Sequence, residues 1–115
     1  MDDRVVYQAM VDAASAGRRV VLATVVATRG STPRHAGSKM LIDPTRGLIG
    51  TIGGGCGEAD VIAAAGVVLA SGTPRLVRVE LTDPVDSWSP AVCGGVMDVL
   101  VEPIAPAAAA GRHDG

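Results

Sequence analysis

Two cysteines flanked by glycines are the residues of this sequence best suited to chemistry. Cys56 lies within the glycine cluster 53–57, between a predicted strand and a predicted helix. A thiol at a helix N-terminus has a lowered pKa, which makes it a better nucleophile or metal ligand. A small cysteine buried only for packing is the alternative, but such a residue needs no glycines around it. Cys93 repeats the pattern in Cys93-Gly94-Gly95, before a further predicted strand.

The glycine cluster also predicts a site for an anion. Gly53, Gly54 and Gly55 allow positive φ and a close approach of a ligand to the backbone. The helix that follows presents unpaired N–H groups and partial positive charge, which together favour a phosphate. The spacing is neither that of a Walker A loop nor that of a dinucleotide-binding loop. A tight turn that binds nothing therefore stays an alternative.

A second polar segment follows the apolar run at 20–28. Arg29, Ser31 and Arg34 lie in this segment and predict a clamp for a phosphate or carboxylate, and Lys39 adds a further cation. A solvated loop with ordinary surface arginines is the alternative. The cysteines are too far apart in sequence for a CxxC redox motif, and no nearby histidine completes a zinc pattern.

The elements that must position these residues follow from the apolar patterning. Valine-rich runs predict strands, and the run at 20–28 is continuous enough to predict a buried central strand. We expect helices at 4–16 and 58–70, and strands at 20–28, 39–42, 48–52, 75–81 and 96–101. The last strand should stop near Pro103. The fold class is therefore α/β, with α+β as the alternative: a mixed sheet of about five strands with packed helices.

Length and composition limit the classes of function. A chain of 115 residues, 48% of them apolar, predicts one domain over 1–104 and a flexible tail over 105–115. A net charge of −2 with few aromatic residues argues against nucleic acid. No apolar stretch is long enough for a membrane span, and the N-terminus lacks the pattern of a signal peptide. Two cysteines in this context favour reduced thiols and a cytoplasmic location. An exposed valine-rich edge allows a homodimer.

Several segments, taken together in their order and spacing, resemble the N-terminal domain of the XdhC/CoxI family. The family comprises accessory proteins of molybdenum hydroxylases such as xanthine dehydrogenase. The resemblance spans about residues 5–104. The segments that carry it are Ala23–Arg34, Gly37–Met40, Gly50–Cys56 with Glu58, Val92–Gly95 and Val101–Pro103.

The resemblance implies a chaperone that binds the molybdenum cofactor as cargo, shields it during sulfuration and delivers it to an apo molybdenum hydroxylase. The cargo would be molybdopterin or its dinucleotide form. The implied cofactor-binding positions are Gly53, Gly54, Gly55, Cys56, Cys93, Gly94 and Gly95, with Arg29, Ser31, Arg34 and Lys39 as a polar rim. Cys56 is the candidate contact to molybdenum. A cofactor sulfurase is a further implied partner.

This sequence departs from the family in one large feature and two small ones. Many members carry a second, Rossmann-type domain after this one, which a separate subunit would have to supply here. Gly57 replaces a larger apolar residue, and His35-Ala36 replaces a proline-rich stretch. Two other functions stay open: a thiol-dependent redox or transferase enzyme that uses Cys56 and Cys93, and a protein-interaction subunit whose glycine loops are only turns.

Overall fold

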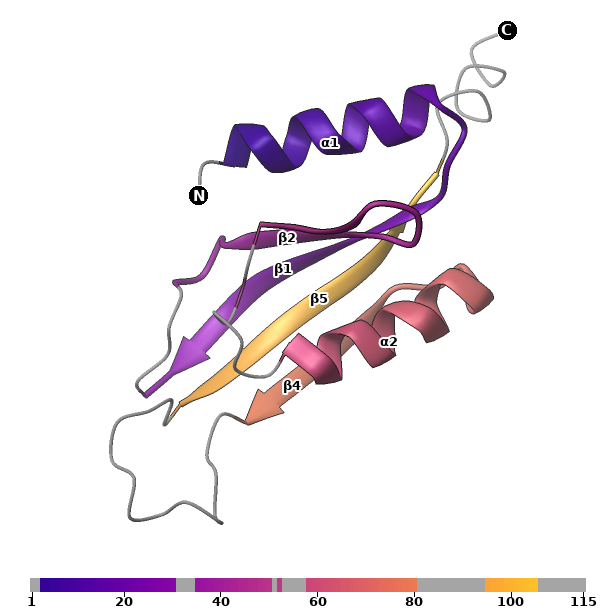
Figure 1. Cartoon of the computed structure of the whole chain (residues 1–115). Coiled ribbons are helices and arrows are strands. Elements are labelled where there is room, and N and C mark those ends of the chain that lie inside the picture. The colour runs from indigo at the N-terminus through magenta and orange to yellow at the C-terminus, as the bar shows by residue number, and fades with distance from the viewer. Residues whose placement is uncertain (1–2, 31–34, 51, 53–57, 81–94, 106–115) are drawn as a thin grey trace, which may run out of the picture.

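The computed structural model describes residues 3–30, 35–50, 52, 58–80 and 95–105 (Figure 1). It contains two helices and five strands, which confirm the predicted elements to within a few residues. They are α1 (Asp3–Ser15), β1 (Val20–Arg29), β2 (Lys39–Asp43), β3 (Gly47–Gly50), α2 (Glu58–Ser71), β4 (Arg75–Glu80) and β5 (Val96–Ile104). The predicted tail lies outside the described residues, apart from Ala105. Neither helix is long and apolar enough to cross a bilayer.

The five strands form one sheet in the order β3-β2-β1-β5-β4, so β1 is central as predicted. Every pairing is antiparallel, which corrects the expectation of a mixed sheet. The reason lies in the crossover through α2. It carries the chain from β3 past β1 to the far edge, where β4 runs in the same direction as β1. β5 then fills the position between them and is antiparallel to both.

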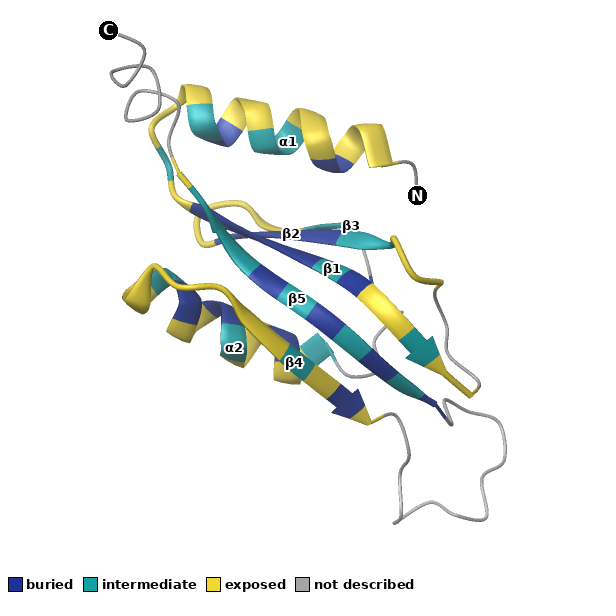
Figure 2. Cartoon of the chain, turned by 180° about the vertical axis from the view of Figure 1, so that it is seen from behind, coloured by how far each residue is buried: buried dark blue, intermediate teal, exposed yellow. Residues whose placement is uncertain are grey.

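The two helices pack on opposite faces of the sheet (Figure 1). Alternate residues of β1 point to opposite faces. Val20 and Leu22 join the core under α1, whereas Val21, Ala23 and Val25 join the core under α2. Both faces of this part of β1 are therefore buried, as its dark blue stretch shows (Figure 2). This double burial is why the sequence there is a continuous apolar run rather than an alternating one.

β5 continues past its predicted end. The strand predicted at 96–101 extends to Ile104, which is next to Pro103, and Pro103 itself pairs with Val21 of β1. β4 begins opposite Val101, so the last residues of β5 have a strand neighbour on one side only. A strand with one open edge tolerates a proline, because one side of its backbone has no ladder to complete.

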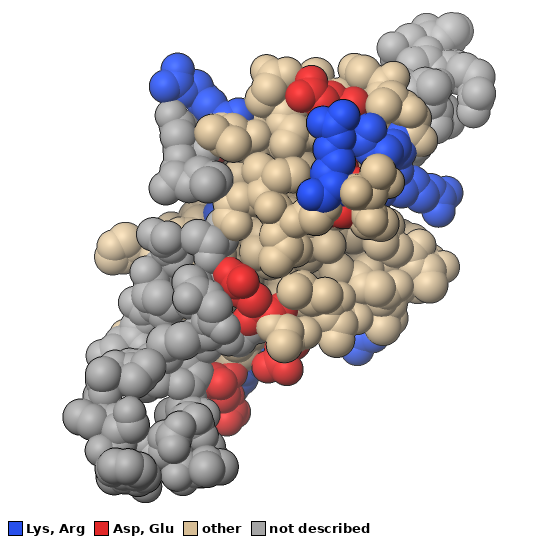
Figure 3. All heavy atoms as spheres, viewed as in Figure 1, with Lys and Arg blue, Asp and Glu red and all other residues tan. Residues whose placement is uncertain are grey.

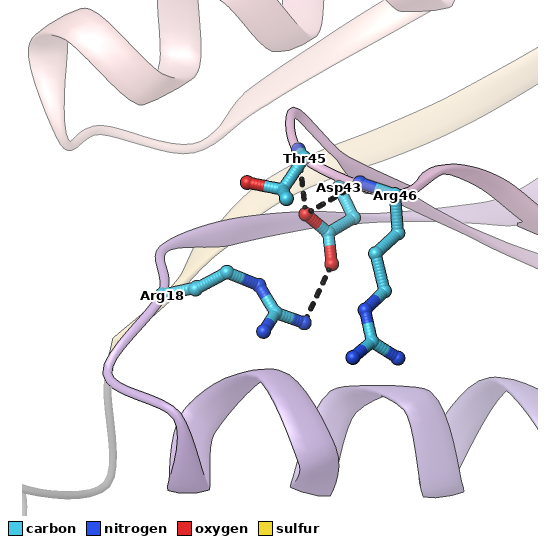
Figure 4. Close-up of polar contacts among 4 residues, drawn as sticks. All are labelled: Arg18, Asp43, Thr45 and Arg46. Carbon is cyan, nitrogen blue, oxygen red and sulfur yellow. Dashed lines mark hydrogen bonds and ion pairs between the residues drawn. The ribbon is translucent and has the colours of Figure 1, made fainter.

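Asp43 holds the turn between β2 and β3, and among the described residues it is the one buried charged side chain. Its Oδ1 accepts hydrogen bonds from the backbone N–H groups of Thr45 at 2.8 Å and Arg46 at 3.2 Å. Its Oδ2 accepts one from Nη2 of Arg18 at 3.0 Å. Because Arg18 lies two residues before β1, this network ties the turn to the start of the central strand. The basic side chains here gather between α1 and the hairpin of β2 and β3 (Figure 3), and Figure 4 shows the network.

These contacts set the protonation of Asp43. Burial alone would raise the pKa of this carboxyl group. The hydrogen bonds from Thr45, Arg18 and Arg46, together with the charge of Arg18, outweigh burial and hold the pKa below its ordinary value of 3.8. Asp43 is therefore ionised in the folded protein at neutral pH.

We expect the stabilisation that Asp43 gives to the folded protein to be lost in acid. The folded-state pKa lies below the unfolded one, so the stabilisation is fully present well above pH 3.8 and is lost as the pH falls through the folded pKa. Urea unfolding of wild type and Asp43→Asn between pH 7 and pH 3 would measure this. The stability gap between them should narrow below about pH 4. A gap that stays constant down to pH 3 would contradict the assignment.

Candidate functional site

The segments that carry the predicted site residues are joined to one end of the sheet. β1 ends at Arg29, which pairs with Val96, the first residue of β5. Glu80, the last residue of β4, pairs with the same Val96 from the other side. The chain therefore leaves β1 and β4, and enters β5, at the same end of the sheet, toward the lower left of Figure 1.

The start of β2, the end of β3 and the start of α2 lie toward this same end. β2 begins at Lys39, which pairs with Thr24 of β1, and β3 ends at Gly50, which pairs with Met40. The N-terminus of α2, at Glu58, points the same way (Figure 1). Segments 51–57 and 81–94, which contain Cys56 and Cys93, are thus both tethered here. We call this end of the sheet, defined by Arg29, Lys39, Gly50, Glu58, Glu80 and Gly95, the loop end.

Three of the predicted site residues are described. Arg29 is exposed at the end of β1 and pairs with Val96, and Gly95, the residue directly before Val96, is buried. The third, Lys39, is half-buried at the start of β2. The other eight lie outside the described residues: Ser31, Arg34, Gly53, Gly54, Gly55, Cys56, Cys93 and Gly94.

The side chain of Lys39 points toward α1 rather than away from the end of the sheet. Its Nζ donates a hydrogen bond to the carbonyl of Gly37 at 2.9 Å and lies 3.9 Å from Oδ2 of Asp3. The same ammonium lies 5.9 Å from the centroid of the Tyr7 ring, within the range of a cation–π contact. Its charge is thus already balanced by α1, and its place in a cofactor rim stays a prediction.

Gly50 and Ile52 fix the entry into the glycine cluster, and the sequence reasoning gave neither a role. Gly50 has a φ of +85°, and a Cβ placed there would lie 2.7 Å from the backbone oxygen of Lys39 and 3.0 Å from Cγ2 of Val6. Two residues on, Ile52 is fully buried in the core under α2. The chain therefore enters residues 53–57 from a fixed position. A glycine closing a strand just before a buried apolar residue was the available signal.

The chemistry of this end follows from its residue types. Within the residues that the structure describes, no three His, Cys, Asp or Glu side chains gather closely enough to hold a metal ion. The loop end includes two described cations, Arg29 and Lys39, and Arg29 pairs with Val96, the residue after the buried Gly95. A guanidinium group can bind a phosphate by donating two N–H groups to its oxygens. The thiols of the tethered segments are the groups that suit a soft metal centre.

Comparison with known proteins places this arrangement in a family. The model of the XdhC and CoxI family matches residues 13–80. The molybdenum cofactor insertion chaperone PaoD of Escherichia coli K12 is 32% identical over 82% of this chain and 29% of its own length. A protein of Bacillus subtilis 168, named as a probable xanthine dehydrogenase subunit, is 36% identical over 73% of this chain and 26% of its own length.

A solved structure shares the fold. A crystal structure described as a xanthine dehydrogenase from Bacillus halodurans superimposes with a TM-score of 0.75 and 31% sequence identity, over 90% of this chain and 31% of that chain. The chain thus spans less than a third of the length of each of these relatives. The match of the family model covers more than half of the sequence, and the chain belongs to the XdhC and CoxI family.

Proposed function

We propose that this chain is an accessory protein of a xanthine dehydrogenase-type molybdenum hydroxylase. It binds the molybdenum cofactor, protects it and delivers it to the apo-enzyme, without turnover of its own. Family membership supports the accessory role. Two relatives, one named as a molybdenum cofactor insertion chaperone and one as a probable xanthine dehydrogenase subunit, support the cargo and the client.

The observation that carries the proposal is the convergence at the loop end. Two cysteine-bearing segments far apart in sequence begin and end at the loop end. The segment with Cys93 joins β4 to β5, which pair at Glu80 and Val96, and the segment with Cys56 joins β3 to α2. A flat pterin with a phosphate at one side and a dithiolene-bound metal at the other needs contacts of two kinds at once. A site assembled from several loops at one sheet end can supply both.

The cargo would be held by residues of different chemistry. The backbone of Gly53, Gly54, Gly55, Gly94 and Gly95 allows close approach of the pterin phosphate, with Arg29, Ser31 and Arg34 donating hydrogen bonds to it. The thiolate of Cys56 contacts molybdenum, and Cys93 completes the thiol side. Lys39 joins the rim if its ammonium turns from α1. The bound form is molybdopterin or its dinucleotide.

The proposal also covers the binding partners of the chain and its location in the cell. The apo-hydroxylase is the client, and further candidate partners are a cofactor sulfurase and a Rossmann-domain protein. A second copy of the chain is another, through an open strand edge. The site of action is the cytoplasm, where thiols such as Cys56 stay reduced.

Delivery is the direct test of the proposed role. The chain is loaded with molybdenum cofactor under anaerobic conditions and mixed with apo xanthine dehydrogenase, and the appearance of hydroxylase activity is followed. The loaded chain should activate the apo-enzyme faster than the same amount of free cofactor. Cys56→Ala should reduce the activation by at least about tenfold, the effect typical of losing a group that tunes a metal site.

A matched variant separates a local effect from a general one. Gly66 lies exposed in α2, and a Cβ there meets nothing within 4 Å. Gly66→Ala should therefore deliver cofactor as well as wild type does, whereas Gly55→Ala should deliver less. Equal activation by free cofactor and by loaded chain would overturn the proposal.

The same convergence also allows the second candidate function, a thiol enzyme that uses Cys56 and Cys93. That function predicts a Cys56–Cys93 disulfide on mild oxidation, visible by mass spectrometry of the unreduced protein. It also predicts a turnover that Cys56→Ser abolishes. A chain that delivers cofactor with Cys93 alkylated would exclude a mechanism that needs both thiols.

A further inference from the structure

A pocket of about 740 Å³ lies between α1 and the hairpin of β2 and β3. It is separate from the loop end, because Arg18, Asp43 and Arg46 surround the start of β1 and the turn of the hairpin, at the opposite end of these strands. Its volume lies within the range typical of sites for small molecules. Nothing in the proposed delivery of cofactor uses this pocket.

The polar side of the pocket is basic. Three arginines line it: Arg4 from α1, Arg18 from the connection to β1 and Arg46 from the turn. Figure 4 shows the side chain of Arg46 extending from the turn toward α1, and the side chain of Arg18 lying between α1 and the hairpin with its guanidinium group directed at Asp43. Basic side chains gather over the same region in Figure 3. This is the arrangement that recognises planar or tetrahedral oxyanions through several N–H groups.

The carboxylates that line the pocket already have hydrogen-bond donors. Asp43 accepts from Arg18 and from the backbone of Thr45 and Arg46. Asp12 accepts from Nε2 of Gln8 at 3.0 Å. Three arginines and two aspartates thus line the pocket. The pair with Asp43 also fixes the orientation of the Arg18 guanidinium before any ligand arrives.

Arg18 has donors in two different settings. Nε of Arg18 is buried, and within the described residues nothing accepts a hydrogen bond from it. Buried donors without an acceptor are rare in folded proteins, because each costs the lost hydrogen bonds to water. Its neighbour Nη2 is already held by Asp43. The Arg18 side chain is 23% exposed, and its further N–H groups, on Nη1 and Nη2, are the donors available to an oxyanion in the pocket.

The other wall of the pocket is apolar. Val5 and Ala9 line it from α1, and Ile49 lines it from β3. Val5 is 48% exposed, although it is a large aliphatic residue beside a pocket. Burying these side chains against a ligand would remove apolar surface from water, which is favourable.

We propose that this pocket binds a small organic anion. Its phosphate or carboxylate group is held by Arg18 and Arg46, and its apolar body contacts Val5, Ala9 and Ile49. The site goes beyond the proposed delivery of cofactor and does not depend on it.

The test is a titration of the ¹⁵N-labelled full chain, followed by NMR at constant ionic strength. The probes are phenyl phosphate, benzoate and inorganic phosphate, and no molybdenum cofactor is present. Phenyl phosphate or benzoate should give saturable shifts at the amides of Gln8, Arg46 and Ile49 and at the Nε–H of Arg18. Comparing these two probes shows which oxyanion the arginines prefer. Inorganic phosphate should bind several-fold more weakly, because it has no apolar body.

A matched pair of variants tests the basic wall. Arg46→Gln should weaken binding of the better probe by about tenfold, the effect of losing a charge-assisted hydrogen bond. Arg75→Gln removes the same charge from the exposed start of β4, at the opposite edge of the sheet, and should leave the affinity within about twofold.

Three results would overturn the proposal. One is the absence of saturable shifts around the pocket with both aromatic probes. Another is an equal loss of affinity in Arg46→Gln and Arg75→Gln, which would indicate non-specific attraction by charge. The third is binding of an acidic peptide such as hexaglutamate while neither aromatic probe binds, which would assign the surface to a protein partner. Because no cofactor is present, failure here leaves the delivery function untouched.

Discussion

Gly50→Ala is expected to lower the free energy of unfolding by about 3 kcal/mol, from two separate costs. The φ of Gly50 is +85°, a conformation that a residue with a Cβ adopts only with strain. The new Cβ would also lie 2.7 Å from the backbone oxygen of Lys39. Backbone of a paired strand cannot move aside cheaply, so β2 and β3 would have to separate. Urea unfolding followed by circular dichroism measures the loss.

Gly47→Ala provides the matched control at the other end of the same strand. Gly47 has a similar φ of +93°, but a Cβ there meets nothing within 4 Å. This variant should lose only the conformational term, about 1 kcal/mol. The difference between the two variants then measures the close approach of Gly50 to β2 and to Val6 of α1. Equal losses in both would show that the strand pairing does not require a glycine at position 50.

Removing the carboxylate of Asp43 is the second substitution with a large expected effect. Asp43→Ala should cost about 3 kcal/mol, because it leaves Arg18 without its partner and the backbone N–H groups of the turn without their acceptor. The side chain of Asp43 is 1% exposed and that of Arg18 is 23% exposed, so water replaces the lost contacts poorly. Asp43→Asn should cost less, because an amide oxygen still accepts from the turn.

The pair of Arg78 and Asp98 is the natural comparison. Its Nε to Oδ1 distance is 3.2 Å, close to that of the buried pair, but the side chain of Arg78 is 56% exposed. Asp98→Ala should therefore cost less than about 1 kcal/mol, as exposed ion pairs usually do. If Asp43→Ala and Asp98→Ala destabilise the chain equally, burial does not determine how much the Asp43 network contributes to the free energy of unfolding.

The sequence predicted what depends on local patterning. The nearly continuous apolar run at 20–28 predicted a buried strand, and the first half of β1 is covered on both faces, because each face there must be apolar for both cores to form. The glycine clusters likewise marked segments next to strand and helix ends. These signals are carried by neighbouring residues, so a single sequence suffices to find them.

The parts that the sequence did not predict depend on distant residues. The close approach of Gly50 to Lys39 needs the pairing of β2 with β3. The bond between Arg18 and Asp43 joins residues 25 positions apart. The antiparallel sheet follows from β5 entering between β1 and β4, and no local pattern specifies which strands become neighbours. The pocket beside α1 arises from the same long-range packing. Whether Cys56 and Cys93 share one site stays a prediction.

Retention of cofactor tests the central claim most directly. Wild type, Cys56→Ala and Gly66→Ala are incubated with molybdenum cofactor under anaerobic conditions and passed through gel filtration, and bound molybdenum and pterin are then quantified. We predict that wild type and Gly66→Ala retain both. Cys56→Ala, with an unchanged urea midpoint, should retain at least about tenfold less molybdenum. Wild type that retains neither component, or Cys56→Ala that retains as much as wild type, would contradict a cofactor site centred on Cys56.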